Sequence, residues 1–485
     1  MKTTERIFML FFFISILTSC EQKTDREKAG PIRIYAENPF YWEYNDKPVL
    51  LIGGSREDNL FNHPEGLQEH LDLLRSVGGN YVRNTMSSRN PGNPWAFKKL
   101  ENGLYDLDQW NDGYWERFSN LIKWANERDI IVQIEIWDPW DYYKSEAAIG
   151  FGAGNVGWES NPFNPILNIN YTAEETGLFT EIETYPAGTP STHLFFHTPP
   201  ELNDIPEVRK YQERFVEKIL SITLEHTNVL YCMSNETGEH PQWGQYWARF
   251  IRQKANDKGK EVFLADMRYN TNLQTEDHQQ LLHDRENFDF FETSQNNNNV
   301  NDQLHYDRFQ EIRNQIVDNP KPLNNIKIYG GEPHWTTSAE EGTRRFWRNI
   351  FGGAASVRFH REGPSSHFFG IGLSELAQTH IKSARMFTET FHIFSCIPSN
   401  HLLSNREDNE AYCIAEEGKQ YAVYFPDGGE VDIDLNNAPG EWHIRWMDIL
   451  ESEWQTATTV SGGSNITLTA PGGGQWAILI IPSDK

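Results

Sequence analysis

The sequence predicts an α/β protein, a (β/α)8 barrel followed by a small antiparallel β-sandwich. Apolar, strand-like runs alternate with segments of helical periodicity, and eight such runs end in polar residues over about 340 residues, which fits a barrel with insertions. The runs end at Ile52, Met86, Ile136, Glu236, Met267, Glu292, Glu332 and Phe359. Beyond residue 400 the helical periodicity stops, and short strands recur between Gly-rich turns, which predicts the sandwich.

A doubly wound open sheet is the alternative arrangement for strands that alternate with helices. Such a sheet binds its ligand at a switch-point crevice, commonly through a Gly-rich phosphate loop. The sequence has no GxGxxG motif after a strand and no P-loop. We therefore favour the barrel.

The helices of the predicted barrel show apolar stripes at helical spacing. In the first of them Leu67, Leu71 and Leu74 share one face, and in a later one Ser338 and Glu341 have the spacing of a capping box. The predicted helices are Pro64–Val77, Asp112–Arg128, Pro206–His226, Gln242–Lys258, Asp302–Val317, the segment from Ser338 through Phe351, and Leu373–Phe391. A long insert over 141–205, rich in Gly, Asn, Pro and aromatic residues, interrupts them and is predicted to be functional.

The C-terminal part is predicted to contain only strands. They are Ala411–Ala415, Tyr421–Phe425, Val431–Leu435, Trp442–Trp446, Asn465–Thr469 and Gln475–Ile481. Two roles fit such a sandwich: it binds glycan, or it packs against the barrel and supports it. We favour the supporting role.

The N-terminus has the features of an export signal. Lys2 and Arg6 give a positive start, residues 7–17 are apolar, and Leu-Thr-Ser precedes Cys20. This resembles a bacterial lipoprotein signal peptide, which implies lipidation of Cys20, attachment to a membrane and a location in the cell envelope. A plain secretory signal with an incidental cysteine is the alternative.

Composition limits the classes of partner. The net charge is −26, which argues against nucleic acid. Aromatic residues make up 13% of the chain, with 16 Trp, which indicates a large core, sugar-stacking surfaces or both. The predicted organisation is a signal peptide at 1–19, a tether at 20–31, the catalytic barrel at 32–400 and the sandwich at 401–485.

Three cysteines remain after Cys20. No CxxC or Cys/His spacing of a metal site is present, and we expect neither a metal nor a cofactor. Cys232 lies within an apolar run and is predicted to be a core residue. For Cys396 and Cys413 a disulfide and two free thiols both stay open.

Glu236 and Glu332 are the predicted catalytic residues, because each ends an apolar run that leads into a polar turn. The carboxyl ends of parallel strands are where α/β folds carry their chemistry. Glu236 ends the fourth predicted strand and Glu332 the seventh, so in a barrel of eight they face each other across the mouth. Glycoside hydrolysis needs such a pair, one carboxyl group protonated to donate to the leaving oxygen and one ionised to attack the anomeric carbon.

These residues resemble the motif of clan A, a superfamily of retaining (β/α)8 glycoside hydrolases. The resemblance implies that Glu236 is the acid/base, that Asn235 binds the sugar 2-hydroxyl and that Glu332 is the nucleophile. Arg83, near the end of the second strand, looks like the Arg that keeps the nucleophile ionised in many such families. The whole arrangement is similar to lipoprotein enzymes of Bacteroidota polysaccharide-utilisation systems.

The sequence also departs from that motif. Glu292 stands where the sixth strand often supplies a Tyr or His that contacts the nucleophile. Arg358, His360 and Arg361 replace the Trp that often ends the eighth strand. Lipoprotein families with a similar N-terminal hairpin use Asp as a catalytic residue, so the resemblance stays at the level of the superfamily.

Other polar and aromatic residues near strand ends are candidates for binding the sugar. Rings can stack on pyranose C–H faces, and Arg can pair with a uronate or sulfate group. Core packing, structural hydrogen bonds and ion pairs within the fold are the alternatives. The candidates are Arg56, Trp137, Asp138, His334, Trp335, Arg358 and His360.

Glu239 is the alternative to Glu236 as the acid, with Glu236 then in a supporting role. Glu135 and Asp138 end the third strand, and they either bind sugar hydroxyls or pair with Arg83 or Arg56. The sequence thus predicts a glycoside hydrolase that acts on plant or algal carbohydrate. The alternative function is a non-catalytic glycan-binding lipoprotein on the same scaffold.

Overall fold

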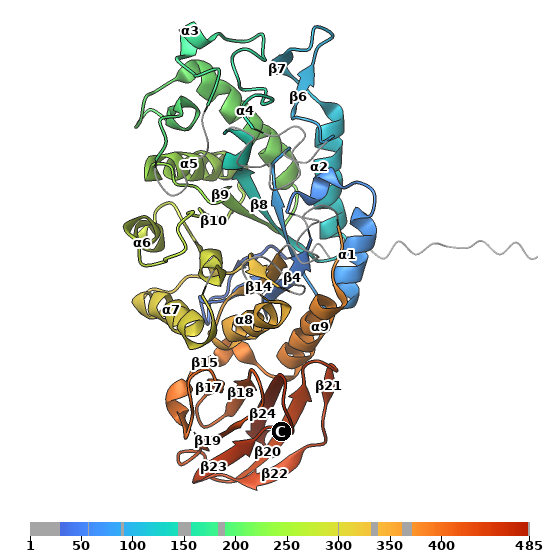
Figure 1. The fold of residues 1–485 in the computed structure, drawn as a ribbon, viewed down its shortest axis with the longest axis vertical. Helices are drawn as coiled ribbons and strands as arrows, with labels where there is room; N and C mark the ends of the chain where they lie inside the picture. Colours follow the sequence, from blue (N-terminus) through green and yellow to red (C-terminus); the bar gives the residue numbers. More distant parts are fainter. Residues whose placement is uncertain are drawn as a thin grey trace, which may run out of the picture.

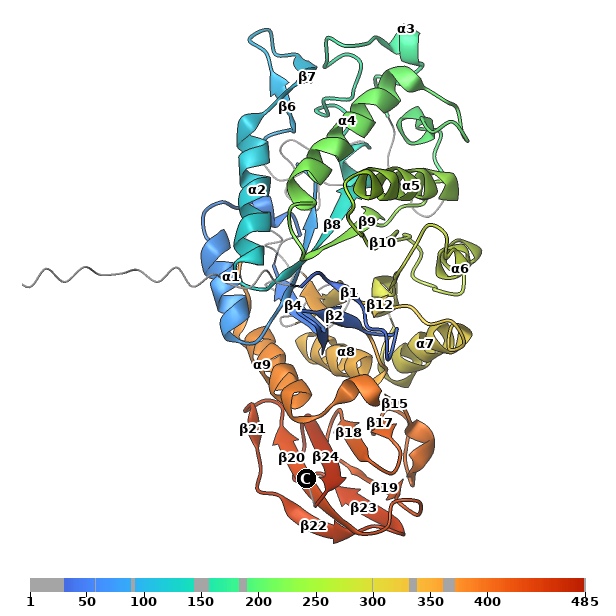
Figure 2. The ribbon, with the colours of Figure 1, turned by 180° about the vertical axis from the view of Figure 1, so that it is seen from behind.

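The computed structural model describes residues 30–56, 58–88, 92–143, 157–182, 190–298, 300–330, 338–360 and 371–483. Figure 1 shows a curled parallel sheet surrounded by helices, with an antiparallel β region at one end of the long axis. Figure 2 gives the same arrangement from behind. The fold is therefore mixed α/β, with a half-barrel sheet and a separate β region.

All neighbouring strands of the central sheet are parallel. Their order is β10-β9-β8-β5-β4-β14-β13, in which strands that follow one another in the chain lie side by side. The bounds are β4 Leu51–Ser55, β5 Tyr81–Thr85, β8 Ile131–Trp137, β9 Val229–Ser234, β10 Leu264–Ala265, β13 Ile328–Tyr329 and β14 Ser356–His360. Every residue of these strands is buried, which explains why several of them, such as β9, read as nearly continuous apolar runs rather than as alternation.

A second parallel pair, β11 (Phe291–Glu292) with β12 (Leu323–Asn324), lies between the two ends of the curled sheet. The backbone N–H of Asp289, just before β11, donates to Leu264 O of β10 at 2.8 Å. On the other side the N–H of Ala355, just before β14, donates to Leu323 O at 2.8 Å. The pair therefore has backbone contacts with the end strand β10 on one side and, on the other, with the segment that leads into β14, the strand next to the other end.

Helices cover the outer face of the sheet, as Figures 1 and 2 show. The bounds are α1 Leu67–Ser76, α2 Asp112–Asn126, α4 Pro206–Thr223, α5 Pro241–Asp257, α6 Glu276–His283, α7 Asp302–Gln315, α8 Ala339–Phe351 and α9 Glu375–Thr390. Helix α6 was not predicted, because its polar sequence buries only His278, Leu281 and Leu282 and shows a weak apolar stripe. The predicted cap of α8 is present, since Ser338 Oγ accepts from the N–H of Glu341 at 3.1 Å.

The region between β5 and α4 contains two features that the sequence did not indicate clearly. Strands β6 (Phe97–Lys99) and β7 (Tyr105–Trp110) form an antiparallel hairpin. The described part of the insert contains the short helix α3 (Ala173–Thr176). Buried Asn side chains, including Asn161 and Asn164, donate to backbone carbonyls of the insert and so replace the missing secondary-structure bonds.

An N-terminal three-stranded sheet closes the amino end of the central sheet. It consists of β1 (Arg33–Ile34), β2 (Trp42–Tyr44) and β3 (Lys47–Val49), and Figure 2 shows it in front of the strands. The fully buried Trp42 packs edge-on against Phe263 and Phe290, and its Nε1 donates to Asn324 Oδ1 at 2.8 Å. Trp42 thus fills the bottom of the sheet's interior.

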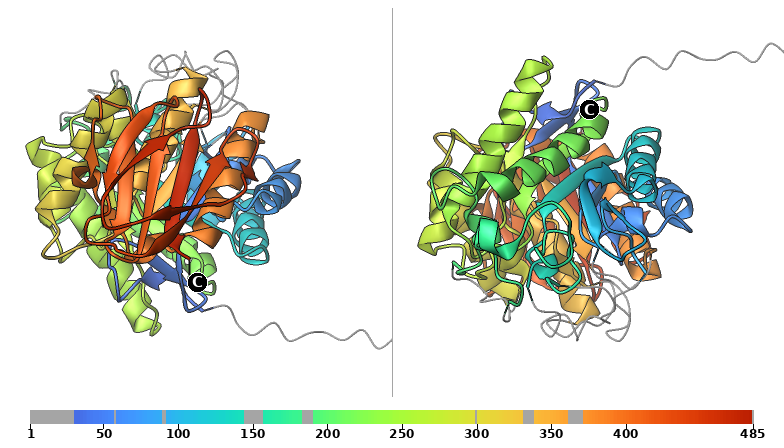
Figure 3. Two further views of the ribbon diagram at one scale, coloured as in Figure 1. Left: turned by 90° about the horizontal axis from the view of Figure 1, so that it is seen from below. Right: turned by 90° about the horizontal axis from the view of Figure 1, so that it is seen from above.

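The C-terminal strands form two antiparallel sheets that share one apolar cluster, a sandwich-like arrangement. The strands are β15 Ile397–Pro398, β16 Leu403–Ser404, β17 Tyr412–Glu416, β18 Gln420–Phe425, β19 Glu430–Asp434, β20 Glu441–Asp448, β21 Glu453–Trp454, β22 Thr458–Ser461, β23 Asn465–Thr469 and β24 Trp476–Pro482. Figure 3 shows these strands spread across the end of the molecule.

The larger C-terminal sheet packs directly on α8 and α9. Tyr424 stacks with Trp347 at 5.9 Å between ring centroids, and Ser383 Oγ donates to Ile449 O at 2.7 Å. Residues of both parts belong to one continuous apolar cluster. These contacts favour the supporting role over a loosely attached binding module.

Cys232, Cys396 and Cys413 are all buried free thiols, so the predicted core position of Cys232 is confirmed and Cys396 and Cys413 are not bonded to each other. Within the described ranges, no helix combines the length and the apolar character needed to cross a membrane. Trp115 of α2 and Trp347 of α8 are buried in the core.

Candidate active site

Glu236 follows β9 at the carboxyl edge of the sheet. Its backbone φ of 56° lies in the left-handed region, which residues other than Gly and Asn rarely adopt. Holding an L-residue there costs roughly 1–2 kcal/mol, and such strain gathers at functional sites. The Glu236 side chain is 14% exposed, whereas Asn235 and Thr237 on either side are buried. The turn therefore leaves one carboxylate partly open to solvent within buried surroundings.

Two side chains from other strands contact Glu236 Oε1. Lys327 Nζ, directly before β13, lies 2.6 Å away, and Gln295 Nε2, after β11, donates at 3.0 Å. Burial lowers the pKa of Lys327, and the nearby Glu236 carboxylate is the main group that opposes this shift. Each of the two charged groups therefore influences whether the other is charged.

Tyr269 is a further neighbour of this carboxylate. Burial raises the pKa of the Tyr269 hydroxyl, and the charge of Glu236 raises it further. The backbone joins the two segments, because the N–H of Thr237 donates to Met267 O at 2.8 Å and the N–H of Tyr269 donates to Thr237 O at 3.0 Å. The segment after β10 thus helps to hold the Glu236 turn.

Asn235 is the centre of the hydrogen-bond network at this edge. Its Oδ1 accepts from Arg83 Nη2 at 2.8 Å and from Lys327 Nζ at 2.6 Å. Its Nδ2 donates to Asp138 Oδ1 at 3.1 Å. The amide is therefore held in one orientation, and Asp138, a predicted sugar ligand, is buried beside it and caps the turn that follows β8.

Arg83 of β5 is fully buried and ion-paired. Its Nε donates to Glu135 Oε1 at 2.8 Å, its Nη2 to Glu135 Oε2 at 2.5 Å, and its Nη1 to Asp58 Oδ2 at 2.8 Å. Burial raises the pKa of Glu135, and Arg83 opposes that shift. Of the two roles predicted for Glu135, the described contacts show the pairing with Arg83.

A layer of hydrogen-bonded polar side chains lies below these charges. Gln133 Nε2 donates to Glu292 Oε1 at 2.8 Å, and Tyr81 OH donates to Gln133 Oε1 at 2.5 Å. Burial raises the pKa of Glu292 to about 7, against the opposing hydrogen bonds from Gln133 and Ser294. Glu292, which stands where a Tyr or His was expected, is thus a hydrogen-bonded interior carboxyl group that is close to half protonated at neutral pH.

Three predicted site residues, Glu332, His334 and Trp335, lie outside the described residues.

Trp137 was predicted as a sugar platform, but its buried position contradicts this prediction. The ring is fully buried and packs against Phe215, Trp243 and Trp247 at centroid distances of 5.5, 5.5 and 5.1 Å. Helices α4 and α5 supply these neighbours, so both faces of the ring are occupied. Trp158, in the insert, is likewise buried and donates to Phe179 O at 2.7 Å.

Arg358 and His360 of β14 are buried inside the fold rather than open at its surface, so neither is an exposed sugar ligand here. Arg358 donates to Ile326 O at 2.9 Å and to Ser55 Oγ. His360 packs against Tyr329 at 5.0 Å between centroids. Arg56, just after β4, is partly exposed and is the predicted cation that has access to solvent at this edge.

Glu239 is fully buried, in contrast to Glu236. Its Oε1 accepts from Tyr143 OH at 2.5 Å and from Ser191 Oγ at 2.8 Å, and its Oε2 accepts from the Ser191 N–H at 3.2 Å. These bonds tie the insert to the turn after β9. The contacts therefore show a structural role for Glu239.

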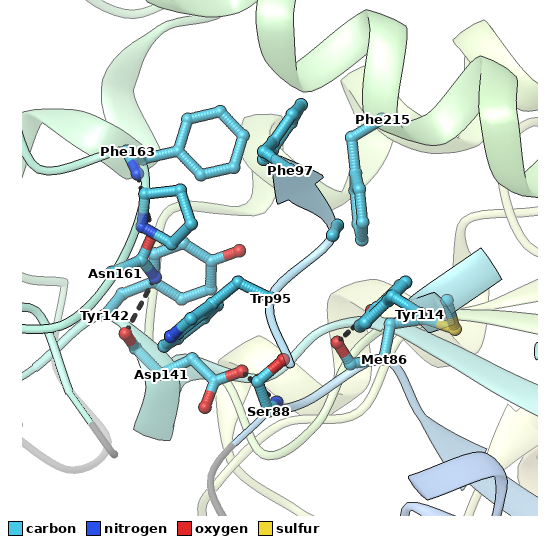
Figure 4. A pocket seen from close by; sticks show the side chains of 12 residues that line it. Met86, Ser88, Trp95, Phe97, Tyr114, Asp141, Tyr142, Asn161, Phe163 and Phe215 are labelled. Atoms are coloured by element: carbon cyan, nitrogen blue, oxygen red, sulfur yellow. Dashed lines mark hydrogen bonds between the residues drawn. The ribbon is translucent and has the colours of Figure 1, made fainter. Parts of the chain in front are cut away.

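A small cavity lies under the loops that follow β5 and β8, as Figure 4 shows. Its volume is about 20 Å³, which is room for about one water molecule. Aromatic residues make up half of its lining, and Asp141 and Ser88 bond to each other at its base, with the Ser88 N–H donating to Asp141 Oδ2 at 3.0 Å. The cavity is a packing gap beside the site and is too small for a sugar.

The sequence did not single out Lys327, Gln295 or Tyr269. One signal was available for Lys327, since a Lys inside the apolar run Ile326–Tyr329 must be buried with a partner. Gln295 and Tyr269 stood in polar loops without any such contrast. Among the described residues, no three His, Cys, Asp or Glu side chains are grouped so that they would hold a metal ion.

Comparisons with known structures agree with this architecture. A glycoside hydrolase family 5 protein from Bacteroides vulgatus matches at a TM-score of 0.62 and 15% identity, over 94% of this chain and 94% of that one. A protein described as "Glycoside hydrolase" matches at 0.62 and 12%, over 94% and 98%. The chain has the fold of glycoside hydrolases.

Three further comparisons concern another solved structure, a family model and the curated proteins. A "putative glycoside hydrolase" from Bacteroides vulgatus matches at a TM-score of 0.58 and 11% identity, over 93% of this chain and 82% of that one. Residues 397–481 match a family model described as "Putative collagen-binding domain of a collagenase". No curated protein matches the sequence.

Proposed function

We propose that the protein is a retaining glycoside hydrolase that cleaves a plant or algal oligo- or polysaccharide, with Glu236 as the acid/base and Glu332 as the nucleophile. The observation that carries this proposal is the position of Glu236. It is the partly exposed carboxylate of a buried charge network at the carboxyl edge of the sheet, on a strained turn.

The proposal includes a closed barrel of eight strands. Support comes from one apolar cluster in the interior, to which each of the eight strand segments contributes. Its members are Leu51, Tyr81, Ile131, Leu230, Cys232, Ala265, Phe290, Ile326 and Ala355, with residues of the N-terminal hairpin below them. The backbone bonds from Asp289 to β10 and from Ala355 to β12 bring the remaining edges together.

The reaction would proceed in two steps. Glu236 donates its proton to the glycosidic oxygen as the bond to the anomeric carbon breaks, and the Glu332 carboxylate bonds to that carbon. Glu236 then takes a proton from water, which attacks the anomeric carbon and releases Glu332. This course requires carboxyl groups about 5–5.5 Å apart, whereas inversion requires about 6.5–9.5 Å.

Lys327 places a condition on the first step. An ammonium ion 2.6 Å from Oε1 stabilises the carboxylate and not the acid. For Glu236 to donate a proton, Lys327 must be neutral or the incoming sugar must displace its Nζ. Burial, which lowers the pKa of Lys327, favours the neutral amine, so the two residues are suited to exchange a proton as substrate excludes water.

We further propose that the protein is attached to the cell envelope by a lipid on Cys20, since the first 20 residues resemble a lipoprotein signal. A polysaccharide outside the cytoplasm would then be its substrate. Labelling with a fatty-acid analogue checks this part, with Cys20→Ser as the variant that should lose the label.

The test of the enzymatic proposal is a screen on plant and algal oligosaccharides with wild type, Glu236→Gln and Glu239→Gln. We expect the wild type to release product from at least one substrate with retention of the anomeric configuration. Glu236→Gln should lose at least about 10²–10⁴-fold in kcat/KM on unactivated substrates, the range of general acid–base catalysis. Glu239→Gln should unfold at a lower temperature than the wild type. Below that temperature, its kcat/KM should match that of the wild type.

Three results would contradict this assignment. Turnover retained in Glu236→Gln but lost in folded Glu239→Gln would transfer the acid role to Glu239. Products of inverted configuration would remove the nucleophile role of Glu332. Tight binding of a glycan by both wild type and Glu236→Gln, with no turnover by either, would establish the non-catalytic alternative.

A further inference from the structure

A second cleft lies far from Glu236, between the N-terminal hairpin, the end of α7 and the segment that leads into the C-terminal strands. Its volume is about 560 Å³, within the roughly 300–1,000 Å³ typical of ligand sites. Its lining includes Phe40 and Glu37 after β1, Arg313 and Asn314 near the end of α7, and His392 after α9. The cleft is therefore formed where three separate parts of the chain meet.

Arg313 is the unusual residue of this cleft. It is only 6% exposed, its buried Nε has no hydrogen-bond partner, and no described residue forms a hydrogen bond or an ion pair with its terminal nitrogens. Its guanidinium carbon lies 3.9 Å from the centroid of the Phe40 ring. Burial lowers the pKa of Arg313, which shows that its surroundings disfavour the charge. A buried guanidinium usually has an acceptor, because leaving its donors unbonded costs free energy.

Two features explain why the cation is tolerated without an acceptor. The Phe40 ring attracts it, and the last turn of α7 presents the negative end of the helix dipole to it. Neither feature uses the N–H donors in the plane of the guanidinium. These donors match a planar, two-oxygen anion such as a carboxylate, or a sulfate group.

The remaining lining suits a sugar ring attached to that anion. Val317 and Ile397 are 52% and 51% exposed, and both border the cleft, where they offer apolar surface to a C–H face. The Asn314 amide is exposed, and the Glu37 carboxylate accepts one bond, from Tyr35 OH, so both have capacity for hydroxyl groups. Glu37 lies beyond ion-pair distance of Arg313 and would disfavour a ligand with anionic groups along its whole surface.

We propose that this cleft, the Arg313 cleft, binds an acidic saccharide, with one carboxylate or sulfate group held by Arg313 and the ring between Val317 and Ile397. The choice of a saccharide over other anions rests on the proposed glycoside hydrolase function. The cleft is on the side of the amino ends of the strands, away from Glu236. It would hold a polysaccharide chain on the enzyme without taking part in the reaction.

Calorimetric titration of the Glu236→Gln protein tests the site without any need for turnover. The probes are trigalacturonate, a sulfated galactan trisaccharide, neutral maltotriose and sodium acetate. We expect one of the two acidic saccharides to bind, and which of them binds shows whether the site takes a carboxylate or a sulfate group. Maltotriose and acetate should bind at least about tenfold more weakly. In the same background, Arg313→Met should weaken that binding about tenfold or more, the loss expected for a charge-assisted pair.

Two variants separate loss of the site from loss of the fold. Asn314→Asp leaves Arg313 in place but adds a negative charge beside it, and should also weaken binding of the acidic saccharide. Arg308→Met, on the same helix but outside the cleft lining, should leave binding unchanged. Equal binding of maltotriose and the acidic saccharides, unchanged binding in folded Arg313→Met, or no binding of either acidic saccharide would overturn the proposal, whatever the turnover assays show.

Discussion

The two ends of the sheet's interior differ in chemistry. At the carboxyl end, Arg83, Glu135, Lys327 and Glu236 form one connected set of buried or nearly buried charges. At the amino end the interior is apolar, and Trp42 fills it. Both ends are shaped by the same strands, so the difference arises from which residues the strands carry at each end.

This difference indicates what each end is for. Burying apolar side chains is the main source of stability, whereas burying charges costs free energy unless every one is paired. An interior built for stability alone would be apolar throughout. The charges at the carboxyl end are what the proposed chemistry at Glu236 would require, whereas the apolar amino end contributes to stability.

The largest expected effect on stability is at the amino end. Trp42→Ala should lower the free energy of unfolding by about 3–5 kcal/mol, because it leaves a cavity and removes the bond to Asn324. Urea unfolding measures this loss. Trp42→Phe, which keeps one aromatic ring but loses the N–H donor and part of the volume of the indole, should lose less, about 1–3 kcal/mol. If folded Trp42→Ala lost as much activity as Glu236→Gln, the two ends would not be functionally separate.

Glu292, between the two ends, should make stability depend on pH. Its pKa is about 7 in the folded protein against an ordinary value of 4.5. Between these values the folded state holds a proton that the unfolded state has released, so stability falls as pH rises through this window, by about 3 kcal/mol from this group. Glu292→Gln removes this component, since an amide can accept from Gln133 and donate to Ser294.

Urea midpoints at pH 5, 6, 7 and 8 give the comparison. The wild type should lose more stability than Glu292→Gln between pH 5 and 8, and other titrating groups cancel in the difference. Parallel pH curves for the two proteins would show that Glu292 titrates normally in the fold.

The sequence predicted the strands and Glu236 because both leave a local signal. Continuous apolar runs mark buried parallel strands, and a carboxylate directly after such a run marks the edge of the sheet. The network around Glu236 left no such signal. Gln295 is 59 residues from its partner, and only the curl of the sheet brings the two together.

For Trp137 the sequence predicted a role that the structure contradicts. A Trp at a strand end is a reasonable sugar platform, but the aromatic residues of α4 and α5 enclose it. Nothing near Trp137 in the chain indicates that enclosure, because side-chain packing between distant helices is set by the tertiary fold. Helix α6 was missed for a related reason, since tertiary contacts and not an apolar stripe hold it.

At the carboxyl end, Lys327→Met should change the pH dependence of activity. Removing an ammonium ion 2.6 Å from Glu236 makes protonation of that carboxylate easier. The basic limb of the kcat/KM profile, which reports loss of the general acid, should move to higher pH by about one unit or more. Lys327→Arg, which keeps the positive charge, should stay closer to the wild type. An unmoved limb in Lys327→Met would show that Lys327 is only structural.

The smallest effect concerns the backbone of Glu236. Glu236→Ala and Glu236→Gly both remove the carboxylate and its bonds to Lys327 and Gln295, so their difference reports only the backbone. At φ 56° Gly avoids the strain of an L-residue, and we expect the Gly variant to be more stable by roughly 1 kcal/mol. At Asn235, whose φ is not positive, Gly should instead be the less stable of the two. Equal stability of the two Glu236 variants in urea would mean that the turn stores no strain, and that the carboxylate is held by its side-chain contacts alone.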